Sequence, residues 1–394
     1  MTNINENKYQ NYLLVSFVFM FSGMMAAINQ FKLPMIMTDV AKSFNMPMSQ
    51  AVWMMSIFTF VGIFLALPAG SFAQKWGPKN MVILAALFVA GGSILGSMAS
   101  SGGMMIFSRG LEGVGFIFVT VCGPMAIGKY VEPSKIGSAM GIWAVWVCIG
   151  QVIANNLTPP LYTAIGFRGV WLVYAIITLV MAAGVIFLIK TPKELEADQA
   201  EQSSVKISEA FRNKNLWFLC LSFLIFNAIL MAVLVFAPTF LTSNGVSVTT
   251  AGFATSIPML LALVSSPIFG KLSDIIGSRK KLYLIALMAM GIGSGMMFSS
   301  TGAVMYVGAV ILGLVGLGTP AMALSSIGEI VQKPELAGMG MGLIMTCQGV
   351  GMFVGSMIMP YLLKLTGENW TTAGWILLPI ALVSVIIAAM AKFK

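Results

Sequence analysis

The chain has 394 residues, of which 58% are hydrophobic and only 9% are charged, with a formal net charge of +9. A soluble domain carries about 25% charged residues, so this composition excludes an ordinary soluble enzyme and indicates a protein embedded in lipid. Histidine is absent, and the four cysteines lack metal-ligand spacing. We therefore expect no histidine-based catalysis, no metal, no cofactor and no disulfide.

Apolar stretches of about 18 to 28 residues, each long enough to cross a hydrocarbon core of roughly 30 Å, recur twelve times along the chain. Lipid offers no partner for backbone polar groups, so each stretch should be helical. We predict an all-α integral membrane protein with twelve transmembrane helices. The stretches cover residues 12–40, 51–69, 81–99, 104–128, 136–161 and 170–189, then 217–241, 251–269, 282–299, 304–327, 336–363 and 373–391.

The basic residues are distributed unequally between the two sides of this topology. Of 22 Lys and Arg, 17 fall in the N-terminus, in alternate loops or in the C-terminus on one side, whereas Lys42, Arg168 and Lys364 fall on the other. The positive-inside rule makes the first side cytoplasmic. We expect a multi-pass plasma membrane protein, such as one of the bacterial inner membrane, with both termini cytoplasmic. The positive charge then reflects orientation, and no nucleic-acid partner is needed.

Two basic, glycine-punctuated loops, residues 70–79 and 270–279, lie 200 positions apart. A second pair keeps a similar offset, because Glu132-Pro133 followed by two glycines recurs as Lys333-Pro334 followed by two glycines. The repeat predicts two six-helix bundles related by a pseudo-two-fold axis. We place the bundles at residues 1–190 and 215–394 and a polar cytoplasmic linker at 191–214.

The second loop fits the pattern G-x-x-x-D-x-x-G-x-[RK], and the first fits it except for Gln74 at the acidic position. With twelve spans in two halves, this resembles the major facilitator superfamily of secondary transporters over essentially the whole chain. The resemblance implies that these loops latch the cytoplasmic ends of helices. The latch residues so implied are Gly70, Gly77, Lys79, Gly270, Asp274, Gly277 and Arg279.

Two further signatures of that family are partly present. The run from Arg109 to Gly115 resembles R-x-x-Q-G-x-G, with Glu112 in place of glutamine. The exporter signature of the fifth span is half matched, because Gly141 and Gly150 fit its spacing but Ala154-Asn155 replaces Gly-Pro. This departure weakens an assignment as a drug exporter.

Arg109 and Glu112 are opposite charges deep in one predicted span, and a spacing of three places them on one helical face. One hypothesis makes Glu112 a proton-coupling carboxylate that responds when Arg109 turns toward substrate. The alternative is a permanent ion pair that lets the bundle tolerate both charges.

Lys32 lies late in the first span, one turn after Asn29 and just before Pro34. A cation at the centre of a bilayer costs about 2.5 to 3.5 kcal/mol on insertion scales, which favours a water-lined cavity or a partner. We hypothesise that Lys32 attracts an anionic substrate that Asn29 or Gln30 orients. Alternatively, Lys32 snorkels to the interface or pairs with Asp39.

Buried amides in other spans are further candidates. Gln151, Asn155 and Thr158 recur at spacings of four and three in the fifth span. Such a stripe lines a solute path or joins helices by hydrogen bonds worth roughly 1 kcal/mol. Because transporter sites form between repeats near the midplane, we include Gln151, Asn155, Asn227 and Gln348 among the substrate-binding candidates, with Asn29, Gln30, Lys32 and Arg109.

No phosphate loop, nucleophile elbow or metal-ligand cluster occurs, so we do not expect an enzyme. The deep cations Lys32 and Arg109 outnumber the deep acid Glu112. We therefore predict secondary active transport of a small organic anion, such as a carboxylate, coupled to protons or to exchange. The alternatives are a proton-coupled exporter of multiple drugs or amphipathic compounds and, less favoured, a non-transporting membrane sensor. The expected partners are the solute, protons and the lipid bilayer, and we expect a monomer.

The unequal loops give a first prediction. Because only the second loop carries an acid, Asp274→Asn should disturb the balance between inward-facing and outward-facing states more than Gln74→Ala does. Labelling of a cysteine placed on the outer side measures that balance, and equal changes in the two variants contradict the prediction.

Overall fold

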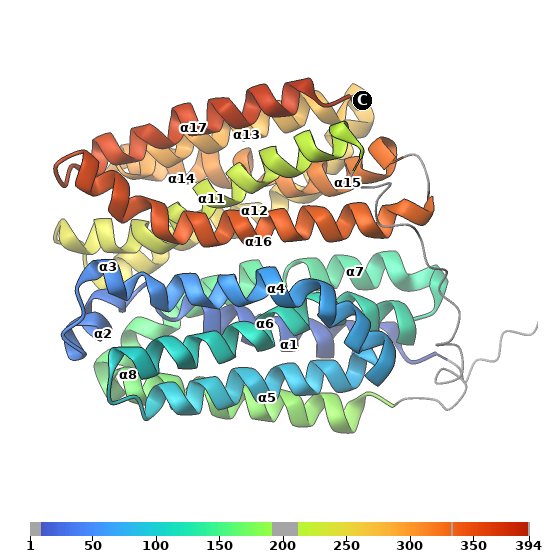
Figure 1. Cartoon of the computed structure of the whole chain (residues 1–394), viewed down its shortest axis with the longest axis horizontal. Helices are drawn as coiled ribbons and strands as arrows, with labels where there is room; N and C mark the ends of the chain where they lie inside the picture. Colours follow the sequence, from blue (N-terminus) through green and yellow to red (C-terminus); the bar gives the residue numbers. More distant parts are fainter. Residues whose placement is uncertain (1–8, 191–211, 332–333, 393–394) are drawn as a thin grey trace, which may run out of the picture.

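The computed structural model describes residues 9–190, 212–331 and 334–392, without the side chains of residues 48, 67, 74, 266, 274 and 334–339. All regular structure in these residues is helical (Figure 1). The helices of the first half are α1 (Tyr12–Phe31), α2 (Met37–Ser43), α3 (Met48–Ala51), α4 (Trp53–Trp76), α5 (Pro78–Ser97), α6 (Gly102–Tyr130), the 3-10 turn η1 (Pro133–Lys135), α7 (Ile136–Ala144) and α8 (Trp146–Leu188).

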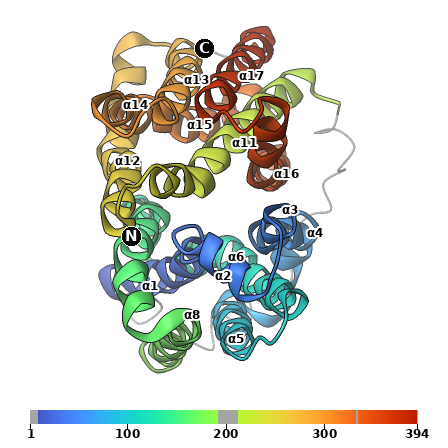
Figure 2. The ribbon, with the colours of Figure 1, turned by 90° about the vertical axis from the view of Figure 1, so that its left-hand side faces the viewer.

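The second half repeats this plan with long helices. They are α11 (Lys214–Ser243), α12 (Val248–Ile276), α13 (Arg279–Met297), α14 (Ala303–Leu314), the 3-10 turn η2 (Gly316–Gly318), α15 (Thr319–Val331), α16 (Pro334–Leu365) and α17 (Trp370–Met390). The two halves form separate bundles lying side by side, as the end-on view of Figure 2 shows.

Within the described residues, ten helical segments are long and apolar enough to cross a membrane. One of them, over residues 133–188, is bent at Gly166 (φ 67°) into two rods and so provides two crossings. The 19-residue α13 adds another, although its first turn carries Arg279, Lys280 and Lys281. Counted in this way, the helices provide the twelve crossings that the hydropathy pattern predicts.

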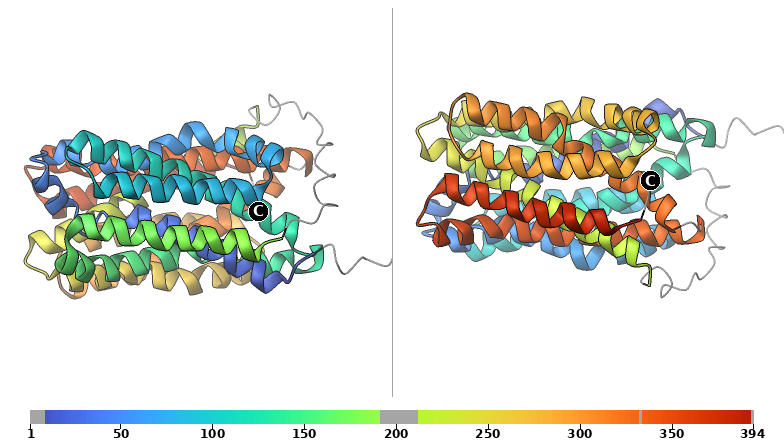
Figure 3. Two further views of the ribbon diagram at one scale, coloured as in Figure 1. Left: turned by 90° about the horizontal axis from the view of Figure 1, so that it is seen from below. Right: turned by 90° about the horizontal axis from the view of Figure 1, so that it is seen from above.

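The outer surfaces of both bundles are apolar. Leu87 on α5, Phe187 on α8 and Ile386 on α17 are all more than half exposed. These helices form the two outer faces of the molecule, as the two views of Figure 3 show. Exposed apolar side chains over such an area fit contact with lipid chains rather than with water.

Three predicted spans are not continuous helices, and one of them, the fifth, is divided at Val145 between α7 and α8. The span predicted over residues 12–40 is divided, because α1 ends at Phe31 and α2 begins only at Met37. Pro34 lies in the intervening turn, where it has no backbone N–H to continue the helical ladder. The tenth span is divided in a similar way by η2 between α14 and α15.

The bundles meet near the end of the molecule that we call the distal end, which carries the loops at residues 44–48 and 243–247. The opposite end, called the linker end, carries residues 190 and 212, which border the segment between the bundles. Near the distal end, α4 packs on α16, and Phe60 contacts Phe353 with ring centroids 5.2 Å apart. The first rod of α8 packs on α12, where Asn155 Nδ2 donates to Thr255 Oγ1 at 3.3 Å.

Two of these contacts are related by the sequence offset of 200. Ser56 and Ser356 join α4 to α16 through a hydroxyl pair 2.8 Å apart. Asn156 Nδ2 in α8 donates to Ser256 Oγ in α12 at 2.9 Å. Position 256 is the repeat equivalent of 56, and 356 that of 156, so one polar contact is made twice across the pseudo-two-fold axis.

The two signature segments lie at the linker end, and each is helical except at its turn, which is Gly77 in the first and Gly277-Ser278 in the second. Both require glycine, because Gly77 has φ 82° and Gly277 has φ 67°. Lys79 donates to carbonyl oxygens at the end of α8, and Lys280 donates to carbonyl oxygens at the end of α17. Lys79 thus shares its role with Lys280, whereas the sequence pattern aligned it with Arg279.

Arg279 makes a different contact, a salt bridge with Glu329 at 2.5 Å. The side chains of Gln74 and Asp274 lie outside the described residues, and Gly70 has open space where a Cβ would stand. The latch role of these loops therefore stays a prediction.

The polar contacts between the bundles generate a second prediction. Each hydrogen bond contributes about 0.5–1.5 kcal/mol, so the double variant Ser56→Ala/Asn156→Ala should shift the equilibrium toward distal opening roughly tenfold. Spin labels on the exposed Ser49 and Thr249 would report this as longer inter-label distances.

The matched control is Thr163→Ala. Its hydroxyl lies near the distal end of α8 but bonds Pro159 O of its own helix. The interpretation is wrong if the double variant and this control give the same distance distribution.

Candidate functional site: a buried charge cluster

Three ionisable side chains meet inside the first bundle. Lys32, at the C-terminal cap of α1, places its Nζ 2.7 Å from Glu112 Oε1. Arg109, one turn before Glu112 on α6, places its Nη1 against Glu112 Oε2. All three side chains are fully buried. We call Lys32, Arg109 and Glu112, with Asn29 and Ser93, the charge cluster.

Asn29 and Ser93 satisfy the remaining hydrogen bonds of the lysine. Lys32 Nζ donates to Asn29 Oδ1 at 2.8 Å and to Ser93 Oγ at 2.7 Å. Ser93 Oγ lies 2.6 Å from Glu112 Oε1 and 2.8 Å from Asn29 Oδ1, and it can donate its proton to one of them. All three donor positions of the ammonium group are therefore used.

Arg109 binds the C-terminal end of α1, just before the turn that separates α1 from α2. Its Nη1 donates to Asn29 O at 2.6 Å and its Nη2 to Gln30 O at 3.0 Å. These carbonyls belong to the last turn of α1, where no following helical N–H group is available to donate a hydrogen bond to them. Its Nε donates to Met54 O of α4 at 3.1 Å. One guanidinium thus joins α1, α4 and α6.

Close helix packing and aromatic rings enclose the cluster. At Gly92 of α5, an added Cβ would stand 2.8 Å from Glu112 Cγ, so glycine is needed there for α6 to approach. Lys32 Nζ lies 4.3 Å from the ring centroid of Trp171, and the Arg109 guanidinium lies 4.6 Å from that of Phe58. Both cations therefore gain cation–π contacts where water is excluded.

The formal charge of this cluster is not balanced. Two cations face one carboxylate, and among the described residues Glu112 is the acid that forms salt bridges with either cation. The C-terminal end of α1 contributes a partial charge of roughly −0.5, which offsets part of the excess. With all three groups ionised, a net positive charge remains inside the bundle.

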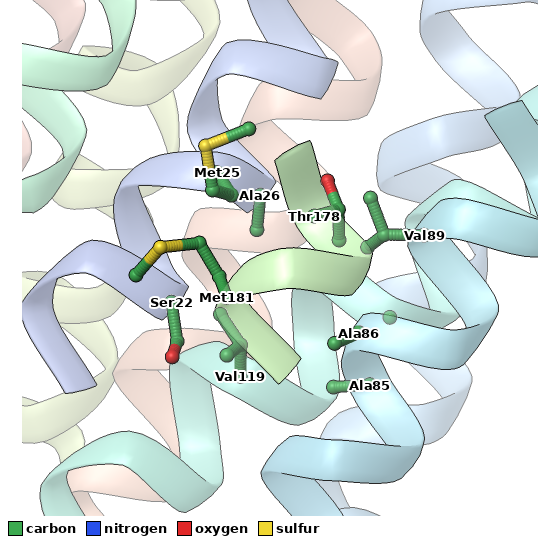
Figure 4. Close-up of a pocket in the computed structure, with 10 residues that line it drawn as sticks. Ser22, Met25, Ala26, Ala85, Ala86, Val89, Val119, Thr178 and Met181 are labelled. Carbon is green, nitrogen blue, oxygen red and sulfur yellow. The ribbon is translucent and has the colours of Figure 1, made fainter. Parts of the chain in front are cut away.

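A small cavity, shown in Figure 4, is lined by residues of α1, α5, α6 and α8. The volume in which a water centre fits is about 10 Å³, which suffices for one water molecule. Asn29 connects this cavity to the charge cluster, because its Nδ2 donates to Met25 O and to Thr178 Oγ1, and both residues line the cavity. Ser22 is the other hydroxyl residue in the lining.

The structure brings Asn29, Lys32, Arg109 and Glu112 together, which joins two sites that the sequence suggested separately. Lys32 pairs with Glu112 rather than with Asp39 or the interface. The cluster lies within the first bundle and its groups are already bonded, so it leaves no room for a solute of several atoms in this conformation.

The other candidate residues are distributed along the helices. Gln30 and Gln151 are fully buried, and neither side-chain amide has a hydrogen-bond partner among the described residues. Asn155 belongs to the contact between the bundles. Asn227 donates to Phe223 O of its own helix, and Gln348 is half-buried.

Sequence reasoning missed Ser93 and Trp171. A serine in an apolar span carries no signal by itself, and its position opposite Glu112 depends on how α5 meets α6. A comparison of the two halves of the sequence carries one signal, because the cluster residues are not repeated. The positions 200 residues after Lys32, Ser93, Arg109 and Glu112 hold Ala232, Gly293, Ala309 and Leu312.

Comparison with known proteins finds transporters. A probable nitrate transporter, NarT, of Staphylococcus carnosus (strain TM300) is 24% identical over 350 residues, covering 86% of this chain and 84% of that protein. A probable L-galactonate transporter of Escherichia coli (strain K12) is 20% identical over 237 residues, covering 56% of this chain and about half, 52%, of that relative.

A solved structure has the same fold over nearly the full length. It is a bacterial homolog of the human lysosomal transporter Spinster in an inward-facing and occupied conformation, with a TM-score of 0.79, 15% sequence identity and 98% of both chains covered. The family model of the Major Facilitator Superfamily matches residues 15–247 and 232–394. This match and the all-helical, two-bundle fold confirm the resemblance drawn from the signature loops. The chain therefore belongs to the Major Facilitator Superfamily and is a membrane transporter rather than an enzyme.

Proposed function

We propose that this protein is a secondary active transporter that moves a small organic anion by alternating access, coupled to protons through Glu112. The observation that carries this proposal is the charge cluster, whose two basic side chains and one carboxylate, when ionised, place a net positive charge at a fully buried site. Ionisable groups inside membranes are expensive and usually functional. The named relatives, a probable nitrate transporter and a probable L-galactonate transporter, are both named for anions.

The excess positive charge of the cluster favours anions over cations as substrates. An anion between the bundles is attracted by the cluster without entering it, whereas a cation is repelled. At a separation of roughly 10 Å and an effective dielectric constant near 20, one unit charge contributes about 1.7 kcal/mol, or more than tenfold in affinity. A site for cations would instead carry an excess of carboxylates.

Protonation of Glu112 provides the coupling. A proton on Glu112 removes the only negative side chain of the cluster and raises its formal charge by one, which strengthens the attraction for an anion. The reverse also holds, because a bound anion favours the protonated carboxyl group by the same free energy. Anion and proton therefore bind together, and this favours symport over exchange.

The closed distal end fits one state of the transport cycle. The excess of basic residues makes the linker end cytoplasmic by the positive-inside rule, so the distal contacts seal the outer side. The bundles then rock about the centre to open that side.

Glu112→Gln separates coupling from binding. The glutamine keeps the shape of the protonated acid but leaves two buried cations without their carboxylate, so the melting temperature should fall. The folded fraction should still show counterflow of the labelled anion in proteoliposomes, while accumulation driven by a proton gradient is lost. In the wild type, affinity should rise as the pH falls, whereas in Glu112→Gln it should be independent of pH. Accumulation by Glu112→Gln at the wild-type level, with the normal pH dependence, would show that Glu112 is not the proton site.

Lys32→Gln tests the attraction. The substitution leaves Arg109 and Glu112 as a neutral pair, so the fold should persist while the KM for the anion rises at least tenfold, corresponding to about 1.4 kcal/mol. The control is Lys42→Gln, which removes an exposed lysine near the distal end. The reading of Lys32 as an attracting charge fails if both variants keep the wild-type KM and melting temperature.

The same vesicles distinguish the other functions. Efflux of a cationic dye driven by protons, without uptake of anions, would identify an exporter of amphipathic compounds. Binding without movement of any solute would identify a sensor.

A further inference from the structure

Two buried amides have hydrogen-bonding capacity that the protein does not use. Gln30 and Gln151 are both 0% exposed, and both the Nε2 and the Oε1 of each lack a partner in the described structure. Natural proteins leave few buried polar atoms unpaired, and each such atom calls for an explanation. Four of them in two side chains point to a ligand that pairs with them during transport.

The two residues stand on the neighbouring helices α1 and α8, of which α8 packs on α12 of the other bundle. Gly150, beside Gln151, packs α8 directly on α1, where an added Cβ would lie 2.6 Å from Ala27 Cβ. Gln151 lies one turn before Asn155, which bonds to α12 of the other bundle. Gln151 therefore lies on the linker-end side of the contacts that join the two bundles near the distal end.

Gln30 connects this region to the charge cluster. Its backbone carbonyl accepts a hydrogen bond from Arg109 Nη2 at 3.0 Å, while its side chain remains unbonded. It also immediately precedes the break in α1, and interrupted helices mark solute sites in many transporters. A ligand that binds Gln30 is thus next to Asn29. The side-chain amide of Asn29 bonds Lys32 and its backbone carbonyl bonds Arg109.

The chemistry of the amides limits the class of ligand. Each amide offers two N–H donors and one carbonyl acceptor, whichever way its nitrogen and oxygen are assigned. An inorganic oxyanion or a plain carboxylate supplies acceptors only, so the two Oε1 atoms would stay unpaired. A hydroxylated carboxylate supplies O–H donors as well as acceptors.

We propose that Gln30 and Gln151 recognise the hydroxyl groups of a hydroxylated organic anion. This inference rests on the proposed function, because the charge cluster provides the attraction for the carboxylate. Sites that hydrogen-bond a hydroxyl group reject the analogue that lacks it far more strongly than apolar pockets distinguish methylene groups.

The test uses pairs of anions matched in carbon number and charge: lactate against propionate, and gluconate against hexanoate. Competition with counterflow in proteoliposomes of the full chain gives an apparent affinity for each anion, with nitrate as the acceptor-only inorganic probe. We expect the hydroxylated member of at least one pair to bind ten times or more tighter than its partner, and tighter than nitrate. If the wild-type protein binds lactate as tightly as propionate and gluconate as tightly as hexanoate, the inference is wrong, and no variant is needed to show it.

Gln30→Leu and Gln151→Leu then locate the recognition. Each should remove most of the preference for the hydroxylated anion while the affinity for the plain carboxylate stays within about threefold. Each should also raise the melting temperature without ligand, because unpaired buried amides are removed. If a leucine variant does not fold, the Gln→Met variant at the same position takes its place in this test. The control is Ser294→Ala, which removes a buried hydroxyl that bonds Met290 O of its own helix and should keep the preference.

A raised melting temperature with an unchanged preference would show that the amides are structural and would overturn the inference. Sorbitol, the neutral counterpart of gluconate, separates the two proposals. If sorbitol competes as well as gluconate, the amides recognise hydroxyl groups but the proposed anion selectivity is wrong. If no probe competes, both proposals fail.

Discussion

Glu112 forms salt bridges with two buried cations at once, and several features of the first bundle enclose these salt bridges. Its carboxylate contacts Lys32 from the end of α1 and Arg109 from its own helix. Removing one member of a buried ionic group leaves an uncompensated charge, which typically costs about 3–5 kcal/mol. The turn after Phe31, the glycine at position 92 and the aromatic rings over the two cations all serve to enclose this contact.

The repeated scaffold and the unrepeated chemistry have different roles. Contacts between the bundles obey the pseudo-symmetry, since Ser56 with Ser356 and Asn156 with Ser256 are the same contact made twice. A symmetric seal lets two bundles rock about a common axis. The charge cluster is not repeated at the equivalent positions of the second bundle, so the proposed proton coupling would act on one half of the molecule.

Much of the fold could be predicted from the sequence, but less of the site. Arg109 and Glu112 are three residues apart, so helical geometry alone places them on one face. The partner of Lys32 could not be identified in that way, because Glu112 lies 80 positions away and a nearer acid, Asp39, competed for the assignment. The interruption of α1 was also missed, since residues 32–36 are apolar apart from the lysine and hydropathy does not register a turn. The fold, by contrast, needed only hydropathy, charge asymmetry and the repeat of the loops.

The sequence by itself determined that the chain spans a membrane in twelve helices, that its two halves are related, and that the charges deep in its spans, Lys32, Arg109 and Glu112, all lie in the first half. These properties are local, because hydrophobicity and backbone hydrogen bonding decide each span without reference to the others. Only the tertiary structure decided which charges meet and which amides remain unpaired. A rotation of α1 by a third of a turn would exchange the environments of Lys32, Gln30 and their neighbours without altering the hydropathy pattern. Helix packing, through close approaches such as that at Gly92, fixes that rotation and with it the chemistry of the site.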